Sequence, residues 1–295
     1  CEMMVLILSL LSIAPNLLPA FTPAGRSTLR FARSAHADHH RFALSLRGGT
    51  FGTRSIVLSG NEPLVDFFTS DMCPYAQRCW IVLEALSVPY NKTVIDLMDK
   101  PDWYLNEVNP RGKVPAIRDR RDGTVVFESL VVAEFLVERF DADGASGLMP
   151  ADPAGRALVR RWNAHLDSAL APAQFTLLMN KDEDAEGQKR AALDAALAVF
   201  EKELVGPFLC GMNFTVADAV ALPFFERLVV GIRGIKGFDP VPPDRYPRLH
   251  AYLEQAMEHP SFAVTKRPEE ALVSLYRAFV DRDYAFGGLN RNQKQ

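Results

Sequence analysis

The pattern of apolar and polar residues divides this chain into two parts. Residues 61–142 show a mixture of strand-like and helix-like patterns. Short runs rich in β-branched and aromatic residues indicate strands there, and the longer stretches between them are typical of helices. The strands are expected at 64–68, 90–97, 114–117 and 124–127, the last two around a hairpin turn at Asp122-Gly123. The helices are expected at 74–86, from Pro101 onward and at 129–140. This order predicts a mixed α/β domain with the sequence βαβαββα.

The second half of the chain shows a different pattern. A segment dense in Gly, Pro and Asp, 143–154, indicates a linker. No strand pattern is convincing beyond it, so we expect an all-helical domain over 155–285 and a disordered polar tail over 286–295. Thr215 and Asp218 have the spacing of an N-capping box, in which each side chain meets the other residue's N–H. The helices are expected at 156–180, 184–205, 215–233, 247–258 and 268–280.

One cysteine lies where an ionised thiol would be stabilised. Cys73 follows the first predicted strand and directly precedes Pro74, which suits the first turn of a helix because that N–H has no partner there. Free N–H groups and the dipole at the helix start favour a thiolate, so we expect a pKa below the ordinary value of ~8.5. The alternative is an inert core cysteine, which fits poorly beside Pro, Gln and Arg. No neighbouring ligand spacing supports a zinc site.

The other cysteines are expected to be structural. Cys79 lies six residues beyond Cys73, which on a helix means a rise of about 9 Å and a different face. A disulfide requires Cα atoms within about 7 Å, so the site is expected to be monothiol and Cys79 a core residue. Cys210 precedes a glycine turn and is expected to be structural.

Composition narrows the function classes. The 295 residues are enough for two domains plus a processed leader, and 48% hydrophobic with 23% charged residues is ordinary for a soluble protein. A net charge of −3 argues against a nucleic-acid-binding protein, which would show a basic patch. Four cysteines are too few for a disulfide scaffold and fit a reducing compartment better.

The first sixty residues resemble targeting segments. The apolar run Val5 to Ala14 is too short to span a bilayer but matches the core of a signal peptide, with a cleavage site near Ala20. We therefore expect a signal-peptide-like segment at 1–20. The Arg-rich, acid-poor stretch behind it predicts a transit-peptide-like, disordered leader at 21–60. Together they resemble the bipartite plastid leaders of algae with secondary plastids. The alternative is a plain secretory signal, for a secreted protein or one of the endomembrane lumen.

Several motifs follow one another in a fixed order. Residues 73–78 read Cys-Pro-Tyr-Ala-Gln-Arg. The others lie at 100–103 (Lys-Pro-Asp-Trp), 109–115 (Asn-Pro-Arg-Gly-Lys-Val-Pro), 127–129 (Phe-Glu-Ser), 208–218, 223–228 and 259–262. Their order resembles the cytosolic glutathione transferases, and the first is similar to the Cys-Pro-Phe-Ala-x-Arg box of the omega and lambda classes. The resemblance covers about 62–280. It implies a thioredoxin-like βαβαββα domain over 61–142, followed by an all-helical C-terminal domain.

The resemblance implies a nucleophile and its backbone partner. Cys73 would form a mixed disulfide with glutathione, whereas most cytosolic transferases use Tyr or Ser to activate the thiol of glutathione. Val114, joined to Pro115 by a cis bond, would pair with the cysteinyl unit of glutathione as a strand does; the alternative is a trans proline in an edge strand. Pro74 and Tyr75 would also contact glutathione, and Tyr75 departs from the Phe that these classes usually carry.

The two ends of glutathione would be bound by side chains. Glu128 and Ser129 would recognise the γ-glutamyl end, with Ser129 at a helix N-terminus that favours the α-carboxylate. Lys100 would pair with the glycyl carboxylate. Taken singly, Lys100 could be a solvated lysine and the other two could simply cap a helix. Phe224 would lie in the cleft for the second substrate, although such a residue is more often part of the core.

The implied function is a glutathione-dependent thiol transferase, acting in deglutathionylation or dehydroascorbate reduction through a single reactive cysteine. Its partners would be glutathione, as co-substrate, and a small disulfide or oxidised substrate, with no metal, nucleic acid or membrane span. Two alternatives are a non-catalytic carrier of a hydrophobic plastid ligand, bound in the cleft between the domains, and an interaction module resembling the chloride intracellular channel proteins. Turnover of glutathione would favour the enzyme. A monomer and a homodimer are both compatible with the sequence.

Overall fold

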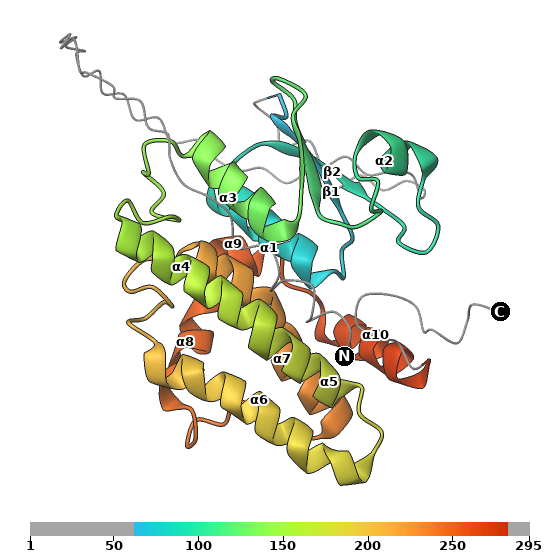
Figure 1. Cartoon of the computed structure of the whole chain (residues 1–295), viewed down its shortest axis with the longest axis vertical. Coiled ribbons are helices and arrows are strands. Elements are labelled where there is room, and N and C mark those ends of the chain that lie inside the picture. Colours follow the sequence, from blue (N-terminus) through green and yellow to red (C-terminus); the bar gives the residue numbers. More distant parts are fainter. Residues whose placement is uncertain (1–61, 283–295) are drawn as a thin grey trace, which may run out of the picture. The chain divides into compact units, whose positions relative to one another are not determined.

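Four strands form one mixed sheet in this protein, whose computed structural model describes residues 62–282 (Figure 1). In the sheet, β1 runs parallel to β2 and antiparallel to β3, and β3 pairs antiparallel with β4. The order in the sheet is β2-β1-β3-β4. The strands are β1 (Val65–Thr69), β2 (Tyr90–Val94), β3 (Ala116–Asp119) and β4 (Val125–Phe127). The predicted leader and tail segments, at 1–60 and 286–295, lie outside the described residues.

The bounds of all four strands differ from the predicted ones, by one residue in β1 and β4 and by more in β2 and β3. β2 ends at Val94, because its partner β1 ends at Thr69 and Val94 is the residue opposite. β3 begins at Ala116 rather than at 114, since Pro115 has no N–H to donate to a neighbouring strand. The hairpin between β3 and β4 turns at Gly123, whose φ of 78° suits glycine. The predicted order of strands and helices is otherwise confirmed.

Three helices complete the first domain, and one of them joins it to the second. They are α1 (Pro74–Ala85), α2 (Asp102–Glu107) and α3 (Ser129–Phe140). Helix α1 packs against α3 and also against α7 (Val216–Lys236) of the helical domain. The side chain of Phe67 is fully buried in the main core, and that of Phe68 lies in a smaller cluster with Tyr104 and Val114. The sheet is therefore covered by apolar side chains on both faces.

Helices fill the second domain, as the sequence predicts. They are α4 (Pro153–His165), a π-helical turn η1 (Leu166–Leu170), α5 (Ala171–Leu178), α6 (Glu183–Glu203), α7, α8 (Pro247–Ala256), α9 (Pro260–Ala263) and α10 (Glu269–Asp281). The capping box at the start of α7 is confirmed, with the Thr215 N–H donating to Oδ2 of Asp218 at 2.8 Å. The short α9 is too brief for a periodic signal and was not predicted.

The helix expected over 156–180 is continuous but not uniform. A π turn at Leu166–Leu170 separates α4 from α5. Pro172 accounts for the change of pitch, because it has no N–H for the carbonyl four residues before it and its ring would collide with that carbonyl in a regular α-helix. The wider turn accommodates the proline without ending the helix.

Candidate functional site

Cys73 lies at the start of α1, in the turn that follows β1. It is the N-cap residue, with an extended backbone, and its N–H donates to the Ser70 carbonyl at 3.0 Å. Its carbonyl accepts the Gln77 N–H at 3.1 Å, the first hydrogen bond of the helix. The half-buried side chain packs against the cluster that contains Phe68 and Val114. The predicted strand–turn–helix placement of this thiol is therefore confirmed.

The pKa of Cys73 does not follow the sequence-based expectation. Burial raises the pKa of this thiol above its usual value. Backbone N–H groups of Ala76 and Tyr75 and the charges of Arg227 and Arg78 lower the pKa, but by less than burial raises it. The expectation of a lowered resting pKa was wrong, because it counted the helix start and left out the loss of hydration.

Glu128 and Ser129 lie together at the start of α3. Glu128 is the N-cap residue, with a φ of 74°, and its exposed carboxylate forms an ion pair with Arg111 at 2.6 Å. Ser129 is 9% exposed, and its Oγ accepts a hydrogen bond from Nη1 of Arg78 at 3.1 Å. Both side chains therefore have partners within the protein. Their contact with the γ-glutamyl end of glutathione stays a prediction.

The segment before β3 carries the other predicted glutathione contacts. The Val114–Pro115 peptide bond is cis, as the resemblance predicts. Lys100 is exposed, and no carboxylate of residues 62–282 forms an ion pair with it. The stem of Lys100 crosses Gly112, where a Cβ would lie only 2.8 Å from the lysine Cδ. Gly112 therefore lets the chain pass under Lys100 while its ammonium group stays exposed.

Arg78 is a site residue to which sequence reasoning assigned no role. Its fully buried guanidinium lies 4.8 Å from the ring centre of Tyr75 and 4.4 Å from that of Phe224. Besides Ser129, it donates to the carboxylate of Asp167 in the π turn and to the Val220 carbonyl. The signal was an arginine in a helix whose residues are mostly apolar, because a charge buried there requires partners.

Phe224 lies in the core between the domains. Its side chain is 2% exposed and packs edge-to-face against Tyr75, with ring centres 5.1 Å apart. The predicted contact with a second substrate stays a prediction, and this packing does not support it. The alternative that Phe224 is a core residue describes its surroundings better.

Of the two other described thiols, Cys79 is less accessible than Cys73, and Cys210 is half-buried as Cys73 is. Cys79 is fully buried and donates from Sγ to the Ser129 carbonyl at 3.3 Å. Burial raises the pKa of Cys79 far above its usual range and that of Cys210 to about 11. All three thiols are free. These surroundings support structural roles for Cys79 and Cys210.

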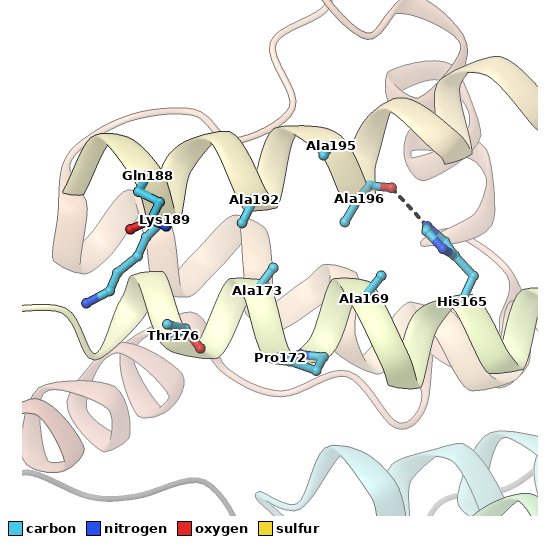
Figure 2. A pocket seen from close by; sticks show the side chains of 10 residues that line it. All are labelled: His165, Ala169, Pro172, Ala173, Thr176, Gln188, Lys189, Ala192, Ala195 and Ala196. Atoms are coloured by element: carbon cyan, nitrogen blue, oxygen red, sulfur yellow. Dashed lines mark hydrogen bonds between the residues drawn. The ribbon is translucent and has the colours of Figure 1, made fainter. Parts of the chain in front are cut away.

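A hollow of the described surface lies away from the predicted site. A shallow groove between α5 and α6 is lined mainly by alanines, with His165 near one end and Lys189 near the other (Figure 2). None of the predicted site residues lines it. Over residues 62–282 no cluster of His, Cys, Asp and Glu could hold a metal ion. No helix in the same region is long and apolar enough to cross a membrane.

A thioredoxin-like domain with a thiol at its first helix, followed by a helical domain, defines a class of protein, and comparison with known proteins identifies it. Residues 72–139 match the family described as "Glutathione S-transferase, N-terminal domain", and residues 182–255 match the corresponding C-terminal domain. The "Probable glutathione S-transferase DHAR1, cytosolic" of Oryza sativa subsp. japonica is 30% identical over 203 residues, 68% of this chain and 87% of that protein. The chain therefore belongs to the glutathione S-transferase family.

Two further comparisons agree with this assignment. "Glutathione S-transferase L1" of Arabidopsis thaliana is 27% identical over 215 residues, 72% of this chain and 86% of that protein. The crystal structure of glutathione transferase Omega 3C from Trametes versicolor has a TM-score of 0.67 at 24% identity, covering 76% of this chain and 93% of that one. The structural likeness shows the shared fold. Membership of the family makes the protein a glutathione transferase enzyme, with glutathione as its substrate.

Proposed function

We propose that the protein is a glutathione-dependent thiol transferase that works through one reactive cysteine, Cys73. The surroundings of this thiol are the main support. Two backbone N–H groups and the positive charges of Arg78 and Arg227 favour its ionised form. Among residues 62–282, no backbone N–H favours the thiolate of Cys79 or Cys210, and each of these thiols has only one arginine that lowers its pKa. A thiolate is the form of cysteine that attacks disulfides. Cys73 is therefore the group best placed to exchange with a glutathione mixed disulfide.

The reaction has two exchange steps. The Cys73 thiolate attacks the glutathionyl sulfur of a substrate disulfide, forming a Cys73–glutathione disulfide and releasing the substrate as a thiolate, which takes up a proton. The thiolate of a second glutathione then attacks the glutathionyl sulfur bound to Cys73. Oxidised glutathione leaves and the Cys73 thiolate is restored. Each step breaks one S–S bond and forms one, so no other reductant is needed.

Dehydroascorbate reduction is a variant with the same nucleophile. Two glutathione molecules supply two electrons and two protons, and ascorbate and oxidised glutathione are the products. Relatives with DHAR in their names support this variant at about 30% identity. The nucleophile would again be Cys73, with the mixed disulfide as the enzyme-bound intermediate.

Binding residues hold glutathione but take no part in bond making. The Val114 backbone would pair with its cysteinyl unit, the start of α3 would bind its γ-glutamyl end, and Lys100 would bind its glycyl carboxylate. The ammonium group of Lys100 is exposed and has no ion-pair partner among residues 62–282, which supports the last contact. Positioning of this kind raises the rate by orienting the reacting sulfurs.

A thiol-transfer assay with matched cysteine variants tests the proposal. Cys73→Ser should abolish deglutathionylation and dehydroascorbate reduction, because a serine hydroxyl stays un-ionised without a base. Cys79→Ser should keep most of the activity, since its thiol is buried. Mass spectrometry of the wild type with oxidised glutathione should find the glutathionyl group on Cys73. Equal loss in both variants would contradict the monothiol mechanism, and tight ligand binding without any turnover would favour a carrier.

A further inference from the structure

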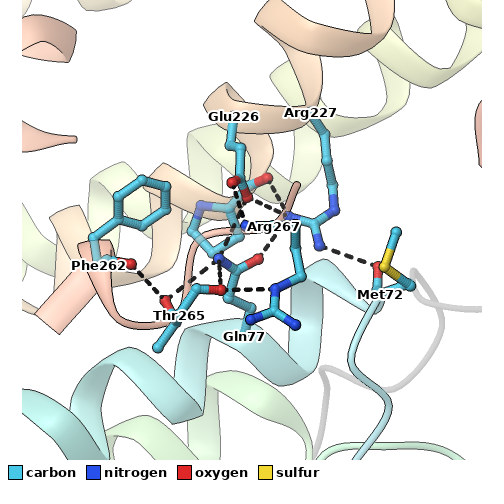
Figure 3. Close-up of polar contacts among 8 residues, drawn as sticks. Met72, Gln77, Glu226, Arg227, Phe262, Thr265 and Arg267 are labelled. Atoms are coloured by element: carbon cyan, nitrogen blue, oxygen red, sulfur yellow. Dashed lines mark hydrogen bonds and ion pairs between the residues drawn. The ribbon is translucent and has the colours of Figure 1, made fainter. Parts of the chain in front are cut away.

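A cluster of buried polar side chains lies where α1 meets the helical domain (Figure 3). Gln77 of α1, Glu226 and Arg227 of α7, and Thr265 are each at most 2% exposed. Buried charges and amides are costly unless hydrogen bonds compensate for the lost water. The burial of these four side chains near the turn that carries Cys73 therefore needs a structural or functional explanation.

Arg227 reaches from the helical domain to the turn that carries the nucleophile. Its Nη2 donates to the carbonyl of Met72 at 3.1 Å, and Met72 directly precedes Cys73. Its Nη1 donates to Oε1 of Gln77 at 2.7 Å and to the Pro223 carbonyl at 2.8 Å. One guanidinium thus holds the backbone before the thiol and a side chain on the first turn of α1.

The guanidinium is itself held in place. Oε2 of Glu226 accepts from Nη1 of Arg227 at 3.2 Å, and Oε1 of Glu226 accepts the Arg267 backbone N–H at 2.8 Å. Nε2 of Gln77 donates to the Thr265 carbonyl at 3.2 Å. Within residues 62–282, Nε of Arg227 is buried with no hydrogen-bond partner. The planar fork of an arginine suits several acceptors in fixed positions, which a lysine ammonium does not reproduce.

We infer that Arg227 is a positioning residue for the chemistry of Cys73: it fixes the Met72 carbonyl and holds a positive charge beside the thiol. This inference rests on the proposed role of Cys73. The nucleophile is then completed by the helical domain and is not a property of the thioredoxin-like domain alone. The charge of Arg227 lowers the pKa of Cys73 against the effect of burial. The other charged or titratable groups near the thiol or near Arg227 are Tyr75, Arg78, Cys79, Glu226, Arg267 and Tyr276.

Alkylation of Cys73 by iodoacetamide tests the inference without glutathione. Rate constants are measured on the full chain between about pH 6 and 10, with the modified Cys73 peptide followed by mass spectrometry. Arg227→Gln should move the profile to higher pH and lower the rate at about pH 7.5 by about tenfold, the effect of one pKa unit. Arg227→Lys keeps the charge and should restore the rate to within about threefold. The matched control is Arg233→Gln, an exposed arginine of α7 paired with Asp239, which should match the wild type.

A wild-type profile for Arg227→Gln, or an equal loss in Arg233→Gln, would overturn the inference. If Arg227→Gln does not fold, Arg227→Lys decides. Its ammonium cannot hold the Met72 carbonyl and Gln77 together, so kcat for a glutathionylated substrate should fall about tenfold at unchanged KM, and a wild-type kcat would overturn the inference. Absence of glutathione turnover in the wild type would instead refute the proposed function, while the alkylation comparison would still judge Arg227.

Discussion

At the scale of single residues, burial and ionisation act on Cys73 in opposite directions. Packing removes water from the thiol and raises its pKa, while the helix start and two arginines favour the thiolate. The protonated thiol is therefore the resting form near neutral pH. A substrate disulfide reacts only with the ionised fraction, so the rate of Cys73 should rise with pH through the neutral range.

Ser129 has two roles to separate, because its Oγ already accepts a hydrogen bond from Arg78. If it also donates to the γ-glutamyl carboxylate, Ser129→Ala should weaken glutathione binding by about one to two orders of magnitude, since a hydrogen bond to a charged group is worth ~1.5–3 kcal/mol. Titration calorimetry on a Cys73→Ser background, which cannot form the mixed disulfide, measures the affinity.

The control for Ser129 is Ser168→Ala. Ser168 is an exposed serine of the π turn that bonds to the Ala164 carbonyl at 2.7 Å, and its loss should leave glutathione affinity unchanged. An unchanged affinity in Ser129→Ala, together with a lower thermal midpoint, would show that Ser129 only supports Arg78. The predicted γ-glutamyl contact would then be withdrawn.

At the scale of elements, Asp119 joins the β3–β4 hairpin to the end of α3. Its fully buried carboxylate accepts hydrogen bonds from Arg121, beyond β3, and from Arg139 of α3 at 2.7 Å. These partners hold the pKa of Asp119 well below its usual range. The ionised carboxylate therefore stabilises the fold at pH values above the pKa that Asp119 has in the unfolded chain. This contribution is lost as the pH falls toward the lower pKa that Asp119 has in the folded protein.

Asp119→Asn should lower the free energy of unfolding by about 1–2 kcal/mol at neutral pH, because three charged hydrogen bonds are weakened and both arginines are partly solvated. The gap between variant and wild type should narrow at about pH 3, where the wild type begins to lose the same contribution. Urea unfolding at both pH values measures this. Glu138→Gln, which alters an exposed pair with Arg156, should show neither effect. A gap that stays constant with pH would contradict the ionised role of Asp119.

The sequence predicts elements better than it predicts the site. The strands, the main helices and the capping box depend on residues close together in the chain, so their patterns are visible locally. The partners of Arg78 are not visible in this way, because Ser129, Asp167 and Val220 lie 51, 89 and 142 residues away from it in the sequence. The raised pKa of Cys73 likewise depends on packing by distant segments. The only local sign of these contacts is a charged residue among the apolar residues of a helix, as at Glu226 and Arg227.

At the scale of the whole molecule, two buried arginines connect the domains from opposite directions. Arg78 extends from α1 to Asp167 of the helical domain, and Arg227 extends from α7 to Met72. Arg227 contacts the turn that carries Cys73, Arg78 lies five residues beyond Cys73 on α1, and both charges favour the thiolate. The relative position of the two domains should therefore affect the reactivity of the thiol.

Asp167→Asn tests this connection. It leaves the guanidinium of Arg78 without its counter-charge, so we expect the free energy of unfolding to fall by about 2 kcal/mol. This is less than the cost for a fully buried pair, because Asp167 is 34% exposed. Hydrogen exchange should quicken in α1. Asp194→Asn is the matched control, since Asp194 pairs with Arg245 inside the helical domain at similar exposure, and it should leave exchange in α1 unchanged. Unaltered α1 exchange in Asp167→Asn would argue against the connection.

The π turn also affects how this protein tolerates changes in length. A turn of this kind holds one residue more than an α-helical turn. Removal of one residue between Leu166 and Leu170 takes out this extra residue, so α5 should keep nearly the same face toward α7, with Pro172 then bending an ordinary helix. In a regular α-helix, the loss of one residue turns everything beyond it by about 100°. The same removal from α7 would rotate Glu226 and Arg227 away from the thiol turn with no wider turn to absorb it. The loss of one residue should therefore be better tolerated at the π turn than in α7.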